Sequence, residues 1–197
     1  KICKYVDIPF QHVSGRILRR MRRGKSGSAV RETVAKLRRA IPEITLRTSL
    51  IVGFPGETEE EFRELLDFVE EARFDRLGVF KYSVEEGTAA ALMGDQIPEE
   101  EKESRWQEVM ELQADISRSK NESLIGTIQH VMVDAHDVES KRFIGRTQAH
   151  APEVDGVVYL EKGYTNGART EMRLGDMVDV RINQALDYDL IGAILDA

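Results

Sequence analysis

The feature that most constrains the fold is residues 50–62, LIVGFPGETEEEF. An apolar run reaches a Gly-Phe-Pro-Gly segment at 53–56 and changes at once into a cluster of acids. Thr58 and Glu61 have the Thr-x-x-Glu spacing of a capping box, which predicts the first turn of a helix. The stretch therefore predicts a buried strand, a tight turn and an amphipathic helix in immediate succession.

The alternation of strands and helices extends to about residue 124. Strands are predicted at 4–10, 46–54 and 77–83, and helices at 28–40, at 58–73 and from Pro98 onward. Strands separated by helices of this length favour right-handed crossovers and a parallel sheet. An apolar stripe on the second helix would cover that sheet. It consists of Phe62, Leu65, Leu66 and Val69.

The pattern changes after residue 124. Short segments rich in β-forming residues are separated by Gly, Asn, Asp and Pro, which is typical of a small barrel or sandwich. We therefore predict two domains, residues 1–124 and 125–197. The predicted strands of the second domain are 126–135, 143–149, 156–161, 176–185 and 188–195.

Composition excludes several classes of protein. With 197 residues and 41% hydrophobic residues, the chain can bury one moderate core or two small ones. No apolar run approaches the roughly 20 residues of a membrane-spanning helix, so a cytoplasmic protein without membrane contact is predicted. The single cysteine, Cys3, cannot form an internal disulfide, and alone it cannot hold zinc or an iron-sulfur cluster.

The charges divide unevenly along the chain. The net charge is −7, and residues 125–197 hold 7 Lys/Arg against 12 Asp/Glu, a net charge of −5. Residues 15–39 hold ten Arg/Lys and a single acid, Glu32. Such a basic stretch is either a solvated surface or a contact for an anionic partner, and the sequence leaves both interpretations open.

The acids after Gly56 decide what the turn at 53–56 can bind. A phosphate site uses free N–H groups at a helix N-terminus, and the four acids here would repel a phosphate. They are Glu57, Glu59, Glu60 and Glu61. The Walker and dinucleotide-binding fingerprints are also absent. Two interpretations remain, a simple capped turn or a ligand-binding edge at the carboxyl end of a parallel strand.

The other strand ends favour the ligand-binding interpretation. Polar residues able to hydrogen-bond a zwitterionic ligand follow Pro9, namely Gln11, His12, Ser14 and Arg16. The third strand ends with Phe80 and Tyr82, for which packing in the core is the alternative. If the strands are neighbours, these ends meet at one edge of the sheet. His130 and His136 lack a second spaced set of ligands, so no metal site is predicted.

Four segments resemble the radical S-adenosylmethionine methylthiotransferases, most closely the RimO branch, over essentially the whole chain. They are YVDIPFQHVSGRILRRMRR, RTSLIVGFPGETEEEF, FKYSVEEGTAAA and APEVDGVVYL with GDMVDVRINQALDYDLIGAI. The resemblance implies an α/β fold, the C-terminal part of a half-open TIM-like radical SAM barrel, followed by a small all-β TRAM barrel that recognises the substrate.

The resemblance also implies that the chain is a fragment. Members of the family carry a CxxxCxxC motif in the first barrel loop and further cluster cysteines in an N-terminal domain, and this sequence has neither set. The ligands of the [4Fe-4S] clusters are therefore expected outside this chain. The fragment alone is expected to be inactive, and no catalytic residue or metal ligand is assigned within it.

The implied activity is methylthiolation of an aspartate of small-subunit ribosomal protein twelve, in the ribosome or during its assembly. S-adenosylmethionine would be both radical source and methyl donor, and an auxiliary cluster would deliver sulfur. The alternatives are a tRNA adenosine methylthiotransferase and a non-catalytic binding module. The acidic barrel with few aromatic residues suits a basic ribosomal protein better than RNA.

The resemblance places the cofactor at the strand ends. By position, Gln11 and Ser14 would contact its ribose or methionyl part, and Arg47 and Ser49 would flank it. The backbone of Ile51 and Gly53 would lie against adenine, with Phe80 or Tyr82 over the ring.

Overall fold

A computed structural model describes residues 2–24, 26–138, 142–161 and 172–195. The chain divides into two compact units. One is Tyr5–Ile116, and the other consists of the described residues from Ser117 onward together with those before Tyr5. Each unit has a hydrophobic core of its own.

The first unit is built on a parallel sheet of β1 (Tyr5–Asp7), β2 (Thr45–Val52) and β3 (Arg76–Lys81) in the order β1-β2-β3. The predicted parallel sheet is therefore confirmed. The predicted first strand, 4–10, is cut short at Asp7, because Pro9 has no N–H to donate to a ladder. The chain nevertheless continues beside β2, where Gln11 forms an isolated bridge with Leu50.

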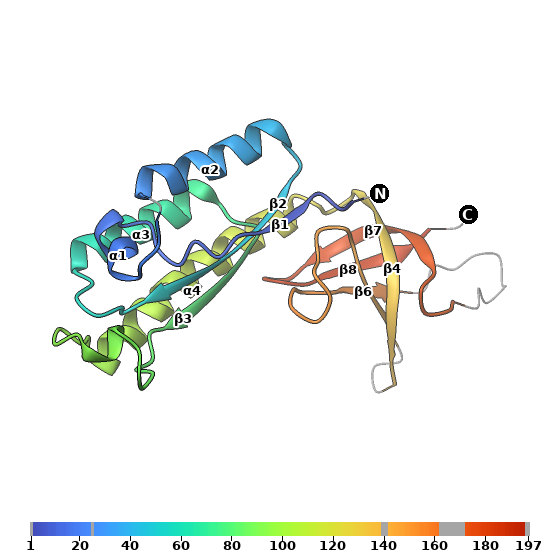
Figure 1. Cartoon of the computed structure of the whole chain (residues 1–197). Helices are drawn as coiled ribbons and strands as arrows, with labels where there is room; N and C mark the ends of the chain where they lie inside the picture. The colour runs from blue at the N-terminus through green and yellow to red at the C-terminus, as the bar shows by residue number, and fades with distance from the viewer. Residues whose placement is uncertain (1, 25, 139–141, 162–171, 196–197) are drawn as a thin grey trace. The chain divides into compact units, whose positions relative to one another are not determined.

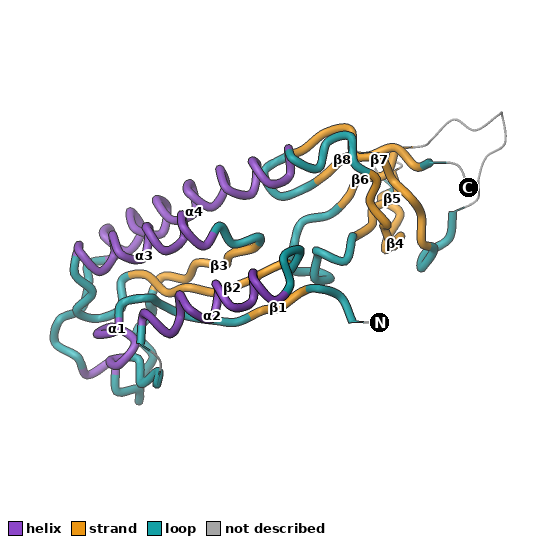
Figure 2. Tube along the Cα trace, turned by 90° about the horizontal axis from the view of Figure 1, so that it is seen from above, coloured by secondary structure: helices purple, strands orange, loops and turns teal. Residues whose placement is uncertain are grey.

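Helices cover one face of this sheet (Figures 1 and 2). They are α1 (Gly15–Arg20), α2 (Gly27–Ala40), α3 (Glu59–Ala72) and α4 (Glu99–Glu122), with a 3-10 turn η1 (Ala90–Leu92) before α4. No helix in the described part of the chain has the length and apolar character needed to cross a membrane. The short helix α1 was not predicted, since its three arginines and Gly15 obscure the two buried residues, Ile17 and Leu18.

The first core lies between these helices and the sheet. Alternate residues of β2 are buried there, namely Leu46, Thr48, Leu50 and Val52. The predicted stripe of α3 contributes Phe62, Leu65 and Val69, while Leu66 is only partly buried. From α4, Val109 and Gln113 are buried on the same side. Apart from Leu66, the period-2 and period-3.6 patterns thus bury the residues that they predict.

The second unit is a closed barrel in the strand order β4-β5-β6-β8-β7. Its strands are β4 (Ile128–Asp137), β5 (Arg142–Arg146), β6 (Val158–Glu161), β7 (Met177–Ala185) and β8 (Leu190–Ile194). All pairs are antiparallel except β6 with β8. Inward-facing residues such as Val131, Leu160 and Ile182 form its core. Of the two predicted forms, barrel or sandwich, the barrel is the correct one.

Candidate functional site

The face of the sheet opposite the helices carries a half-buried set of residues. Arg47, Ser49 and Ile51 alternate along β2 with the buried residues, so they point away from the first core. In the register with β3, Ser49 pairs with Gly78 and Ile51 pairs with Phe80. We use the name open face for the five residues Arg47, Ser49, Ile51, Gly78 and Phe80.

The open face combines an aromatic ring with polar groups. Phe80 is 57% exposed, which is unusual for a phenylalanine inside a strand. Arg47 Nη1 lies 2.5 Å from Oδ2 of Asp7 on β1, so a guanidinium paired with a carboxylate belongs to this face. A Cβ at Gly78 would lie 3.4 Å from the Phe80 ring and 3.7 Å from Ser49 Oγ. This face can therefore seat a flat ring with polar groups at its edge.

Gln11 lies next to the open face in a left-handed conformation, with φ 71°. Two backbone hydrogen bonds hold it there: its N–H donates to the Ser49 carbonyl at 2.9 Å, and its carbonyl accepts from Ile51 N at 2.8 Å. Within the described part of the chain, its side-chain amide has no hydrogen-bond partner. That amide is therefore available to a ligand at the edge.

The turn after β2 depends on glycine. Gly53 and Gly56 have φ 69° and 76°, in the region that residues with a Cβ rarely adopt. The N–H of Gly53 donates to Oε2 of Glu57 at 3.0 Å. The N–H of Gly56 donates to the Asp95 carbonyl at 2.7 Å, which ties the loop after β3 to the turn.

Glu57 is a fully buried carboxylate beneath this turn. Arg105 of α4, itself 5% exposed in its side chain, donates to Glu57 Oε1 at 2.8 Å and to its carbonyl at 3.2 Å. The same guanidinium contacts the exposed carboxylate of Glu101 and lies 5.3 Å from the centre of the Phe62 ring. The sequence predicts that Glu57 repels an anion together with the acids of α3, but Arg105 compensates the charge of Glu57 within the fold.

His12 adjoins the same buried pair. Its Nδ1 accepts from Ser14 N at 2.9 Å, and its Nε2 lies 3.4 Å from Glu57 Oε2, with both side chains fully buried. The hydrogen bond to Nδ1 places the proton of a neutral ring on Nε2, facing the carboxylate. Sequence reasoning noted His12 but missed its partner, because nothing local relates residues 12, 57 and 105.

Glu61 of α3 joins the end of β1 to the turn. It completes the predicted capping box with Thr58 and accepts from Ser14 Oγ at 2.7 Å and Arg16 Nε at 2.9 Å. Arg16 also donates to the Gly56 carbonyl. Burial raises the pKa of Glu61, but hydrogen bonds from Arg16, the Thr58 N–H and Ser14 outweigh it and lower the pKa to about 2.

Replacement of Glu61 by glutamine should therefore cost stability in a pH-dependent manner. A carboxylate whose pKa is lowered in the folded state stabilises it above the unfolded pKa, and that contribution disappears as the pH falls through the folded pKa. We expect the difference from wild type to be about 2 kcal/mol at pH 7, since the partial exposure of Arg16 reduces the full effect of the shift. It should shrink toward zero between pH 4.5 and about 2. Urea unfolding at a series of pH values measures it.

The control for this experiment is Glu70→Gln, which removes an exposed carboxylate from the same helix. A Glu61→Gln effect that stays constant from pH 7 to about pH 2.5 would show that the carboxylate charge is not what stabilises this corner.

The eight residues predicted to contact the cofactor fall into two groups. Five lie on or beside the open face, namely Gln11, Arg47, Ser49, Ile51 and Phe80. The other three are engaged in the fold. Ser14 is buried and donates its hydroxyl to Glu61, and the N–H of Gly53 is donated to Glu57. Tyr82 packs against Phe54, 5.2 Å between ring centres, and under Lys102. Their contacts with a cofactor stay predictions.

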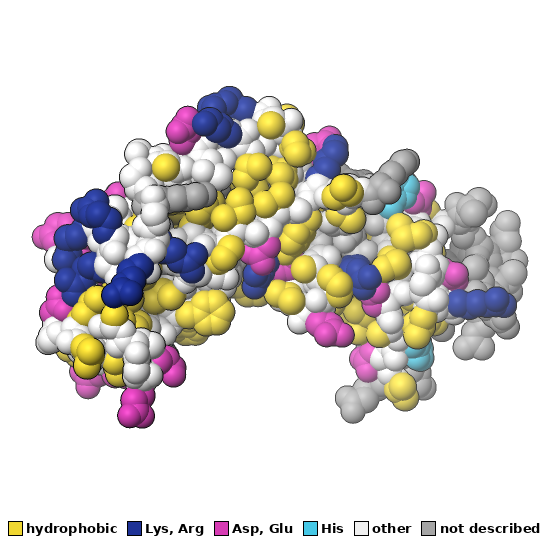
Figure 3. All heavy atoms as spheres, viewed as in Figure 1, with side chains coloured by type: hydrophobic (Ala, Val, Ile, Leu, Met, Phe, Trp, Pro, Cys, Tyr) yellow, Lys and Arg dark blue, Asp and Glu magenta, His cyan; other side chains and the backbone are white. Residues whose placement is uncertain are grey.

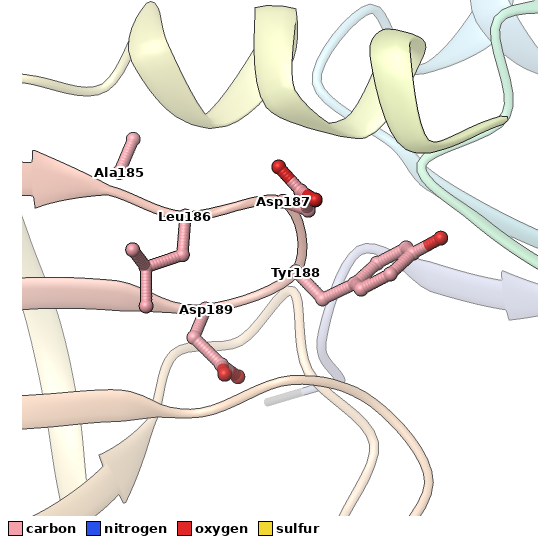
Figure 4. Close-up of a pocket in the computed structure, with 5 residues that line it drawn as sticks. All are labelled: Ala185, Leu186, Asp187, Tyr188 and Asp189. Atoms are coloured by element: carbon pink, nitrogen blue, oxygen red, sulfur yellow. The ribbon is translucent and has the colours of Figure 1, made fainter. Parts of the chain in front are cut away.

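The barrel carries a shallow pocket of about 330 Å³ at the turn between β7 and β8 (Figure 4). Leu186 and Tyr188 are 45% and 38% exposed there. Arg118 at the end of α4 donates to Asp187 Oδ1 at 2.7 Å and lowers the pKa of Asp187 by this hydrogen bond. Burial and the neighbouring Asp187 raise the pKa of Tyr188. The turn thus presents apolar surface next to an acid.

The described residues contain no group of three or more His, Cys, Asp or Glu side chains that could hold a metal ion. Cys3 is exposed and carries a free thiol. A cluster held by this chain would need ligands that these residues do not provide.

Comparison with known families defines the class of protein. Residues 1–69 match the radical SAM superfamily, and residues 125–195 match the TRAM domain. The chain thus joins a segment of the radical SAM superfamily to a TRAM domain, which confirms the predicted fold class.

The relatives identify the family more closely. The chain is 52% identical over 196 residues to the ribosomal protein uS12 methylthiotransferase RimO of Geobacter sulfurreducens, covering 99% of this chain and 42% of the relative. It is 51% identical to the protein of the same name from Pelobacter propionicus, covering 98% and 42%. The chain belongs to the radical SAM methylthiotransferase family, and it spans less than half the length of these relatives.

Among solved structures, the chain resembles an archaeal Elp3 from Methanocaldococcus infernus with an N-terminal deletion. The two are 14% identical, with a TM-score of 0.42, and the match covers 79% of this chain and 55% of that one.

Proposed function

We propose that this chain supplies a cofactor-binding sheet edge and a substrate-recognising barrel to an enzyme that methylthiolates an aspartate of small-subunit ribosomal protein twelve. The observation that carries the proposal is identity of about half of all positions, over 98–99% of the chain, to proteins named for that activity. The reaction would take place in the cytoplasm, on the ribosome or during its assembly.

The open face fits S-adenosylmethionine. The exposed Phe80 ring and the flat surface at Gly78 suit adenine, and the Gln11 amide and Ser49 hydroxyl suit the ribose or the amino-acid part. When bound, this cofactor supplies the radical and the methyl group. The residues of this chain bind and orient it, and Glu57 with Arg105 holds the neighbouring turn in place.

The [4Fe-4S] clusters do not fit the described residues, since Cys3 has no partner ligands among them. We therefore derive no step through a cluster from this chain. Its ligands would come from the part of the relatives' length that this chain does not span.

We assign cofactor binding to residues 1–124 and substrate recognition to residues 125–197. The net charge of −5 in the second segment suits a basic ribosomal protein. The turn bearing Leu186, Asp187 and Tyr188 offers such a protein an apolar contact beside an acid. A tRNA adenosine methylthiotransferase and a non-catalytic module are the competing functions, and the acidic barrel disfavours the first of them.

A chimera tests the proposal. This chain replaces the matching 42% of the Geobacter sulfurreducens relative, and the product is reconstituted with clusters without oxygen. With S-adenosylmethionine and a sulfur source, the chimera is expected to add a methylthio group to ribosomal protein twelve, measured by mass spectrometry of the intact protein and its peptides.

The control is the same chimera given tRNA as the substrate. Modification of tRNA without modification of the ribosomal protein would contradict the substrate assignment. Cofactor binding in the absence of any modification, with the unmodified relative active in parallel, would favour a non-catalytic module.

A further inference from the structure

Most of the basic side chains of residues 15–39 have acidic partners. Five of the nine described ones form ion pairs, and Lys25 lies outside the described residues. The pairs are Arg16–Glu61, Arg20–Asp95, Arg31–Glu71, Lys36–Glu32 and Arg38–Asp75. The charges of these five side chains are therefore compensated within the fold.

Three of the remaining four lie together. Arg19 is in the last turn of α1, and Arg22 and Arg23 follow its C-cap residue, Met21. All three are exposed, and the described part of the chain offers them no acidic partner. We call them the arginine patch. Figure 3 shows Lys and Arg side chains gathered over α1.

The backbone holds the arginine patch in a fixed form. The N–H of Arg22 donates to the Arg19 carbonyl at 3.0 Å, and that of Arg23 donates to the Leu18 carbonyl at 2.8 Å. Arg22 has φ 57°, a left-handed conformation that costs an ordinary residue about 1 kcal/mol. Three like charges on a rigid turn repel one another unless an anion lies between them.

The position of the patch relates it to the candidate site. Helix α1 begins directly after Ser14, three residues past Gln11 at the carboxyl edge of the sheet. Arg16 and Arg20 of the same helix hold the Gly56 turn and the Asp95 loop. The patch therefore lies on α1 and the turn after it, and α1 starts close to the carboxyl edge of the sheet within the same unit.

We propose that the arginine patch binds the phosphate backbone of RNA. This inference rests on the proposed function, because a ribosomal protein as the substrate would bring RNA with it. Arginine forms bidentate hydrogen bonds with phosphate oxygens, and adjacent guanidinium groups match the repeated charges of a nucleic-acid strand. The acidic barrel repels RNA and suits the basic protein, so the two surfaces divide the recognition of one ribonucleoprotein.

The test uses the whole 197-residue chain and a fluorescein-labelled RNA hairpin of about 20 nucleotides, with binding followed by anisotropy from about 50 to 200 mM salt. The variant is Arg19→Gln with Arg22→Gln and Arg23→Gln. Loss of three phosphate contacts is expected to raise the Kd about 10- to 100-fold at the lower salt concentration and to reduce the slope of log Kd against log salt by about 2.

A matched control removes the same charge elsewhere, by Lys36→Gln, Arg39→Gln and Arg63→Gln. We expect it to change the Kd less than about 3-fold, since net charge acts weakly at a distance in salt. Equal effects of the two triple variants would overturn the proposal, and so would displacement of RNA by polyglutamate at equal charge, which would indicate an acidic protein partner.

A thermal melt of each variant completes the test. Unchanged melting temperatures support a ligand contact, whereas a lower value for the arginine-patch variant alone would show that these arginines stabilise the fold, which contradicts the proposal. RNA binding is measured without methylthiolation. A chain that does not bind RNA would therefore contradict this inference without contradicting the proposed function. Failure of the chimera to modify its protein substrate leaves the binding result intact.

Discussion

Replacement of Glu57 by alanine is expected to destabilise the Tyr5–Ile116 unit by about 3–5 kcal/mol. The change leaves the buried guanidinium of Arg105 without its main counter-charge, because Glu101 is 44% exposed in its side chain and compensates only in part. It also leaves the Gly53 N–H without its acceptor in a buried position. The single substitution therefore removes two supports of the turn that ends β2.

Urea unfolding followed by the fluorescence of Trp106 measures this effect. Trp106 is the only tryptophan of the chain, and its Nε1 donates to the Val79 carbonyl at 3.0 Å, so it reports on the unit that contains Glu57. The control is Glu59→Ala, which removes an acid that is 57% exposed in its side chain and is expected to cost less than about 0.5 kcal/mol.

A double variant separates charge from packing. Glu57→Gln with Arg105→Met removes both buried charges, and it should be less destabilised than Glu57→Gln alone, because no uncompensated charge remains. A Glu57→Ala protein within 1 kcal/mol of wild type, or a double variant less stable than the single, would show that the ion pair does not support the turn.

Local patterns explain what could be predicted from the sequence. The strand, turn and helix around residues 50–62 were predictable because Thr58, Glu61 and the apolar spacing act within a few residues of one another. The barrel strands were predictable for the same reason, from alternation and turn residues. The alternation along β2 puts Arg47, Ser49 and Ile51 on one face, whereas their assignment to the cofactor came from the family resemblance.

The unpredicted parts depend on contacts between distant residues. Glu57 looks like one more acid at the start of a helix, and only the approach of Arg105, 48 residues later in the chain, shows that it is buried. From the sequence, the Ser14 hydroxyl is available to a ligand, but in the structure it donates a hydrogen bond to Glu61. Likewise, the sequence does not reveal which of the basic side chains in residues 15–39 form ion pairs. Only the structure separates the arginine patch from the neighbouring basic residues that have acidic partners.

Replacement of Gly78 by leucine is expected to abolish most cofactor binding while leaving the fold intact. A Cβ at this position has its nearest neighbour at 3.4 Å, an ordinary van der Waals distance, and the backbone has no left-handed strain. Leucine is therefore tolerated in β3. Its side chain would extend from the centre of the open face, between Ser49 and Phe80, into the space proposed for the cofactor ring.

We expect the affinity of the chimera for S-adenosylmethionine to fall about 5- to 150-fold, which is the range that about 1–3 kcal/mol of steric conflict produces. Equilibrium dialysis with labelled cofactor measures the affinity directly, and transfer of the methylthio group to ribosomal protein twelve should fall in parallel. Thermal melts of variant and parent should agree within a few degrees.

The matched control is Gly94→Leu, since Gly94 lies in the loop after β3 and a Cβ there meets nothing within 4 Å. It introduces the same side chain outside the open face, so its affinity should equal that of the parent. A Gly78→Leu protein that binds the cofactor as well as the control would exclude the open face as the cofactor seat. The change Gly78→Leu removes no side-chain hydrogen bond and alters no residue of the core. A fall in affinity for the cofactor therefore shows that the cofactor occupies the open face.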